Sequence, residues 1–175
     1  MKKALAVLAL SAAATGVQAQ QAFVELGVGQ AMYDVEDVPA GVSVDDKDTT
    51  FAISGGWMFT PNIGAEVGYR DLGGISVSAG GASASADVDG FMLGAVGRFN
   101  VAQNIAIVPR IGLYMWDASG GGLASGGSDD GTDLYFGVGA EYSFNKQFFA
   151  GVHWARFDAS DADVDVIELK VGIRF

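Results

Sequence analysis

Few residues of this chain could carry out chemistry, and the single histidine is the first to consider. The 175-residue sequence contains no cysteine, which excludes thiolate metal ligands and a cysteine nucleophile. His153 could act as a general base only with a nucleophile beside it, and no serine follows it at close spacing. We therefore expect no enzyme, no catalytic residue and no cofactor. The more ordinary role of His153 is to partner Glu141 or Glu168.

Four acids from Asp158 to Asp165 have a spacing similar to that of a calcium-binding loop. If Asp161 were the first ligand of an EF-hand, the glycine that the loop requires would fall on Val166, and the bidentate glutamate on Gly172. The EF-hand is therefore rejected, and we assign no metal ligands.

The remaining charges of interest lie in stretches where polar and apolar residues alternate. From Ile63 to Arg70, for example, Glu66 and Arg70 share one face and Val67 and Tyr69 share the other. Such alternation is typical of a strand, whose successive side chains point to opposite faces. If the strands close into a barrel, charges on the inner face meet in its lumen. This assignment predicts a lumenal ion network of Glu25, Glu66, Arg70, Arg98, Arg110, Glu141, His153, Glu168, Lys170 and Arg174.

The elements that must position these charges are eight alternating segments, each longer than an ordinary soluble strand. A tilted strand of this length can cross a membrane. The segments are Ala22–Tyr33, Thr49–Phe59, Ile63–Gly73, Asp87–Phe99, Ile105–Asp117, Gly131–Phe144, Phe148–Asp158 and Asp163–Phe175.

The connections between the segments alternate between short turns and long loops. Short turns on one side and long loops on the other are typical of an outer-membrane barrel, whose short turns face the periplasm. The short turns are Thr60–Asn62, Asn100–Asn104 and Asn145–Gln147, and the long loops are Asp34–Asp48, Gly74–Ala86 and Ala118–Asp130.

Alternation alone cannot decide which face is inside, because a soluble lipocalin-like barrel reverses the two faces of a membrane barrel. The positions of the aromatic residues favour the membrane barrel. Phenylalanines stand at the segment ends beside the short turns, where an interfacial girdle is expected. They are Phe59, Phe99, Phe144, Phe148 and Phe175. The opposite face is rich in glycine, which suits a narrow interior.

The N-terminus has the three-part layout of a secretory signal peptide. Met1-Lys2-Lys3 precedes an uncharged stretch from Ala4 to about Ala14, and Ala19 is a plausible cleavage site. We expect residues 1–19 to be the signal peptide and residues 20–175 to be the barrel domain. No stretch after it is long and apolar enough for a membrane helix. The formal charge of −11 makes nucleic acid a poor partner.

Seventeen of the 21 acids map to the long-loop end, where they form an anionic rim. We expect this rim to attract divalent cations that could bridge it to lipopolysaccharide phosphates; the alternative is that the loops are simply solvated and self-repelling. The lumenal charges have two interpretations as well. They form either a rigid network that fills the barrel or the plug of a narrow, gated pore.

Two stretches resemble a known family, the outer-membrane β-barrel domains similar to the OmpA transmembrane domain. Residues Asn104–Trp116 resemble the fifth strand of that domain, and Lys170–Phe175 resembles its terminal strand with the closing Arg-Phe. The resemblance implies that Phe175 belongs to the signal read by the barrel assembly machinery. It also implies that Arg110, Glu66 and Glu141 correspond in kind to the lumenal ion network of the family.

The sequence thus predicts an all-β fold, an eight-stranded antiparallel up-and-down transmembrane β-barrel in the cell outer membrane, present as a monomer. We expect its role to be structural or surface-interactive, in membrane integrity or adhesion. Its expected partners are outer-membrane lipid and lipopolysaccharide. A narrow diffusion pore is the alternative, and a lipid A-modifying barrel enzyme is a weaker one.

Overall fold

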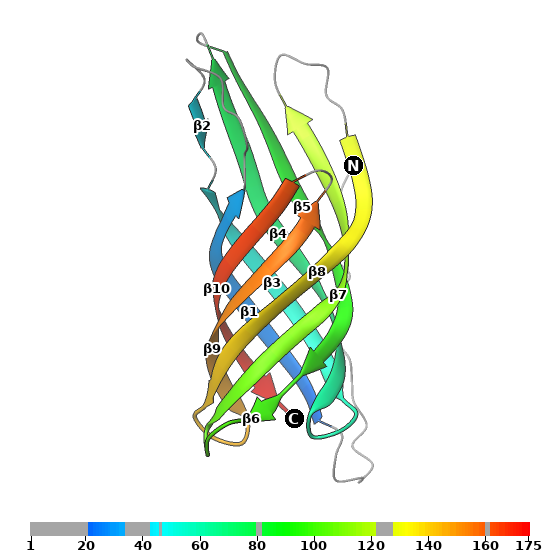
Figure 1. The fold of residues 1–175 in the computed structure, drawn as a ribbon, viewed down its shortest axis with the longest axis vertical. Coiled ribbons are helices and arrows are strands. Elements are labelled where there is room, and N and C mark those ends of the chain that lie inside the picture. The colour runs from blue at the N-terminus through cyan, green and yellow to red at the C-terminus, as the bar shows by residue number, and fades with distance from the viewer. Residues whose placement is uncertain (1–20, 34–42, 46, 80–81, 122–127, 160–161) are drawn as a thin grey trace.

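The fold is a closed antiparallel β-barrel, described by a computed structural model over residues 21–33, 43–45, 47–79, 82–121, 128–159 and 162–175 (Figure 1). Eight long strands build the wall. They are β1 (Gln21–Tyr33), β3 (Lys47–Met58), β4 (Ile63–Ala79), β5 (Ala82–Gly97), β7 (Ile105–Gly121), β8 (Ser128–Ser143), β9 (Phe148–Ala159) and β10 (Ala162–Arg174). The predicted strand number and up-and-down order are therefore confirmed.

Each long strand pairs with its neighbours in the chain, and the first strand pairs with the last. Strand β1 lies between β3 and β10, with Leu26 opposite both Ile53 and Val171. The pairing of β4 with β5 completes the circle. The Phe175 N–H donates to the Ala22 carbonyl at 2.9 Å, which ties the end of the chain to the start of the barrel. Closure leaves no free edge along the wall where β1 pairs with β10.

Two of the predicted long loops are largely strand. Strands β4 and β5 stay paired up to Ala79 opposite Ala82, within the expected loop Gly74–Ala86. Strands β7 and β8 likewise pair up to Ser119 opposite Ser128, within the expected loop Ala118–Asp130. The four strands of this flank continue as a sheet well above the rest of the barrel, as Figure 1 shows. Glycine, serine and alanine give no clear alternation there, which is why the sequence pattern indicated loops.

Two short strands complete the sheet. Strand β2 (Ser43–Asp45) pairs with the upper part of β4, and β6 (Phe99–Asn100) pairs with β7. Strand β2 lies within the expected loop Asp34–Asp48, most of which is outside the described residues. The expected signal peptide, residues 1–19, is also outside them.

The apolar face of the strands points outward. Leucine, valine, isoleucine and phenylalanine side chains on this face are about half exposed, as in Leu169 at 62 % and Phe91 at 58 %. The five phenylalanines of the expected girdle are all exposed at the short-turn end, with Phe175 at 66 %. The wall therefore presents a belt of apolar side chains with aromatic residues at its lower margin.

No helix in the described part of the chain is long and apolar enough to cross a bilayer.

The inward face is not polar throughout, which corrects the expectation from alternation. It forms three layers along the barrel axis. Toward the short turns lies an apolar base layer of Phe23, Met58, Val96, Ala106 and Val108. The charged residues occupy the middle. Toward the long strands lies an apolar upper layer that includes Tyr33, Leu72, Tyr114, Trp116, Tyr135, Phe157, Val164 and Val166.

Candidate functional site

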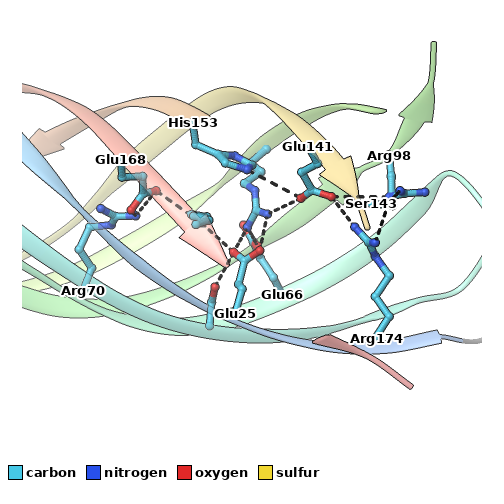
Figure 2. A network of polar contacts seen from close by, with 12 residues as sticks. Glu25, Glu66, Arg70, Arg98, Glu141, Ser143, His153, Glu168 and Arg174 are labelled. Carbon is cyan, nitrogen blue, oxygen red and sulfur yellow. Dashed lines mark hydrogen bonds and ion pairs between the residues drawn. The ribbon is translucent and has the colours of Figure 1, made fainter. Parts of the chain in front are cut away.

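All ten residues of the predicted lumenal network lie inside the barrel, and ion pairs link them into one continuous network (Figure 2). They come from β1, β4, β7, β8, β9 and β10, together with the junction of β5 and β6. Seven of the ten are no more than 3 % exposed, Arg174 is 6 % exposed and Arg110 is 8 % exposed. Among the ten, only Arg98, at the short-turn end, is partly open to solvent, with 19 % of its side chain exposed.

Arg110 is the centre of the network. Its two terminal nitrogens donate to the two carboxylate oxygens of Glu25 at 2.7 and 2.9 Å. This two-pronged geometry is the strongest arrangement for a guanidinium and a carboxylate. Arg110 also donates to Glu66 and lies 3.8 Å from Glu141. One buried cation thus joins carboxylates from three strands, which offsets the cost of burying them.

A second group lies closer to the apolar upper layer. Arg70 donates to both oxygens of Glu168, at 2.7 and 2.9 Å. Lys170 donates to Glu25 at 2.7 Å and lies 3.4 Å from Glu168, so it joins this pair to the centre. The Arg70 guanidinium also lies over the ring of Phe157, with 4.9 Å to the ring centre, where the network meets the apolar upper layer.

A third group surrounds Glu141 at the short-turn end. Arg174 donates to one of its oxygens, and Arg98 Nε lies 3.6 Å from the same oxygen. His153 Nε2 lies 3.7 Å from the other oxygen. Of the two partners expected for His153, Glu141 is the one within ion-pair distance, but neither ring nitrogen forms a hydrogen bond with any described residue.

Sequence reasoning missed four polar residues that support the network. The Ser54 hydroxyl donates to Glu25 at 2.8 Å, and the Tyr135 hydroxyl donates to Glu66 at 2.9 Å. Ser143 accepts hydrogen bonds from Arg98 and Arg174, and Thr50 accepts one from Arg70 at 3.4 Å. Alternation places these residues on the inner face, but a neutral hydroxyl gave no signal of its own.

Glycines make room for the larger side chains. A side chain at Gly139 would overlap the His153 ring, and one at Gly27 would meet Glu168 Oε2 at 2.6 Å. In both cases the crowding group comes from a neighbouring strand. The inward glycines are therefore a condition for the network, because the lumen of eight strands has little space to spare.

Acidic residues gather at the opposite end, where the strands are long. Asp71, Asp89, Asp117 and Asp130 lie directly opposite one another across β4, β5, β7 and β8, and we call them the aspartate row. Like charges in direct cross-strand register repel. The described residues nevertheless contain no group of three or more side chains placed to hold a metal ion. Expected rim acids such as Asp34, Glu36 and Asp161 lie outside the described residues.

On the other side of the rim, Arg156 forms ion pairs with two further acidic residues, Asp163 and Asp165. It donates to both carboxylate oxygens of Asp165, at 2.9 and 2.6 Å, and lies 3.5 Å from Asp163. The hydrogen bonds from Arg156 lower the pKa of Asp165 below its ordinary value.

Comparison with known proteins gives a consistent family assignment. The family profile described as "Outer membrane protein beta-barrel domain" matches residues 4–175. A comparison with curated protein sequences gives no match.

Several solved structures share the fold at low sequence identity. The attachment invasion locus protein Ail of Yersinia pestis is 15 % identical with a TM-score of 0.65, covering 90 % of this chain and 99 % of its own. It has also been solved with the heparin analogue sucrose octasulfate. The N-terminal barrel of Pseudomonas aeruginosa OprF is 17 % identical, with a TM-score of 0.59 and coverages of 87 % and 97 %. Neisserial surface protein A is also 17 % identical, with a TM-score of 0.57 and coverages of 87 % and 95 %.

Proposed function

Because the chain belongs to the outer membrane protein β-barrel family, we propose that it is a non-conducting barrel that supports membrane integrity or contacts an external surface. Its place in the outer membrane follows from the family. The finer role is our proposal, and it rests on the state of the lumen.

The observation that supports a non-conducting barrel is that side chains of the described residues occupy all three layers of the lumen and leave no continuous passage in the upper layer. The apolar base layer and the apolar upper layer lie on either side of the ion network. In the upper layer, Tyr114 is fully buried and Phe157 is 1 % exposed, and their rings pack edge to face with centres 5.1 Å apart. A hydrated ion would have to displace aromatic side chains as well as break ion pairs. A gate made by the charged network alone would be simpler to open.

Conductance in planar lipid bilayers tests this proposal. We expect no discrete channel steps from the refolded chain, and none from Arg110→Ala or from the control Arg156→Ala. The pore alternative predicts steps that Arg110→Ala changes and Arg156→Ala leaves alone. Such steps would overturn the non-conducting role.

The aspartate row supports a proposal about partners. We expect the rim to contact lipopolysaccharide through divalent cations that lie between the aspartates and the lipid phosphates. The attachment protein of Yersinia pestis was solved with a polyanion, but the negative charge of this rim would repel such a ligand. A surface partner of this chain should therefore be cationic or bridged by cations.

Calcium titration of the unmodified chain and of one triple variant separates cation bridging from simple solvation of the rim. Calcium should give saturable heat on titration into the refolded protein, and replacing Asp71, Asp89 and Asp117 together by Asn should abolish it. Cells from which the gene has been deleted should become more resistant to detergent when they express the unmodified chain. The triple variant should restore less of this resistance. Without saturable heat, the cation-bridging proposal is wrong, although the non-conducting role stands.

Shortening the tall flank, which consists of the upper ends of β4, β5, β7 and β8, distinguishes adhesion from membrane integrity. If the protein is an adhesin, variants shortened within residues 74–86 or 118–130 should no longer bind a host or matrix surface. If its role is membrane integrity, cells with these variants should instead lose resistance to detergent. We further propose that the protein is a monomer and is inserted by the barrel assembly machinery, with Phe175 as part of the recognition signal.

A further inference from the structure

Two arginines meet at the periplasmic end of the lumen with one carboxylate between them. Arg98 and Arg174 both contact Glu141, and each has no other carboxylate partner among the described residues. Both also donate to the same oxygen, the Ser143 hydroxyl, at 3.0 and 3.3 Å. Figure 2 shows the two guanidinium groups side by side at this end of the network.

Counting charges shows an unbalanced cation at this place. The network contains five basic residues and four glutamates, with His153 counted as neutral. The carboxylates of Glu25, Glu66 and Glu168 are held by Arg110, Lys170 and Arg70. Arg98 and Arg174 therefore share Glu141, and one positive charge is left over. An uncompensated charge in a largely desolvated site is costly, so an anion is favoured there.

A small cavity lies beside these groups. Its volume is about 20 Å³. Its charged lining consists of three arginines and two glutamates, Arg98, Arg110, Arg174, Glu25 and Glu141, which leaves one positive charge in excess, and the rest of the lining is apolar. Within the described residues, the Nε atoms of Arg98 and Arg110 are buried and have no hydrogen-bond partner. The space fits one particle about the size of a water molecule. It is too small for a phosphate or sulfate.

We propose that this cavity is an anion site, which binds one halide ion between Arg98 and Arg174, chloride under physiological conditions. The guanidinium N–H groups donate to the ion, among them the Nε–H groups of Arg98 and Arg110, which have no hydrogen-bond partner within the described residues. The ion neutralises the extra charge and closes the periplasmic end of the network. The site is independent of the proposed surface role, because it lies at the other end of the barrel.

Thermal unfolding in detergent micelles at constant ionic strength tests the site. Sodium chloride or bromide is exchanged for sodium gluconate, whose anion is too large for the cavity. At a halide concentration ten times the dissociation constant, we expect the unfolding midpoint to rise by about 3 to 6 °C. Arg98→Gln removes the extra charge and should abolish the rise. Arg156→Gln, at the opposite rim, should keep it.

Comparing each variant with the unmodified chain in the same salts removes general salt effects on stability. Crystals grown in bromide give a second measurement, in which an anomalous peak is expected within hydrogen-bonding distance of both Arg98 and Arg174. Equal midpoints in halide and gluconate, an equal rise in Arg98→Gln, or only a water molecule at this position would each overturn the proposal.

Discussion

Arg110 joins three glutamates that are far apart in the chain, so removing it affects more than one contact. Glu25, Glu66 and Glu141 are each no more than 3 % exposed, and Arg110 lies within ion-pair distance of all three. A methionine at position 110 would fill similar space without charge. Two carboxylates would then lose their main cationic partner in a site closed to water.

We expect Arg110→Met to lower the free energy of unfolding by about 3 to 5 kcal/mol, because breaking a buried pair leaves uncompensated charge. Arg156→Met, which breaks a pair that is about one-third exposed, should cost less than about 1 kcal/mol. Urea unfolding in lipid vesicles measures both. Equal costs for the two variants would contradict a central role for Arg110.

Gly139 tests how closely the lumen is packed. Alanine in a strand is ordinarily no worse than glycine, but a Cβ at this position would overlap the His153 ring. We expect Gly139→Ala to cost about 1 to 3 kcal/mol. Adding His153→Ala should recover most of that loss. The outward-facing control Gly55→Ala, whose nearest contact is the Phe23 carbonyl at 3.2 Å, should be milder.

At the scale of the strands, the sequence could predict which side chains point into the barrel. It could not predict at which level along the barrel axis each of them lies. A period of two fixes which side chains point inward, and all ten network residues lie inward. Individual partners depend on strand tilt and register, as with Arg110 and Glu25, which are 85 residues apart. The apolar upper layer was missed for a related reason. Tyr114 and Trp116 alternate correctly, but nothing local indicates that inward residues above the charges become apolar.

The upper ends of β4 and β5 also escaped prediction. The register shifts between Asp71 and Gly73, and Gly73 has a φ of +73°, a conformation that favours glycine. The Asp71 carboxylate accepts from the Gly73 N–H at 2.8 Å, and Asp48 accepts from the Gly74 N–H at 2.7 Å. The aspartate and glycine residues of this β-bulge are types that are also typical of turns, so the sequence pattern indicated the end of a strand. Here the bulge lets the strands continue past the barrel rim.

The hairpin of β9 and β10 carries a pH-dependent contact above the apolar belt. Because hydrogen bonds from Arg156 lower the pKa of Asp165, the pair stabilises the fold above the ordinary aspartate pKa of about 3.9 and loses this effect as the pH falls through the lowered value. Arg156→Gln should therefore raise the Asp165 pKa in a carboxyl NMR titration. Its stability deficit at pH 7 should disappear at strongly acidic pH. An unchanged titration would contradict the pairing.

For the molecule as a whole, the orientation of the barrel can be tested directly. An epitope inserted between Gly80 and Gly81, beyond the paired ends of β4 and β5, should be bound by antibody on intact cells. The same epitope inserted in the turn at residues 101–104 should be bound only after the outer membrane is permeabilised. Heat-modifiable gel migration of both variants confirms that each still forms a barrel. The reverse labelling would invert the assignment of the two ends.

The two flanks of the barrel differ in height. Strands β4, β5, β7 and β8 have 16 or 17 residues, whereas β1, β3, β9 and β10 have 12 or 13 (Figure 1). The lipopolysaccharide that we propose as a partner carries sugar chains, which would cover the short β9–β10 hairpin and leave the tall hairpins accessible. Antibodies raised by immunisation with whole cells should therefore bind mainly to the ends of β4, β5, β7 and β8.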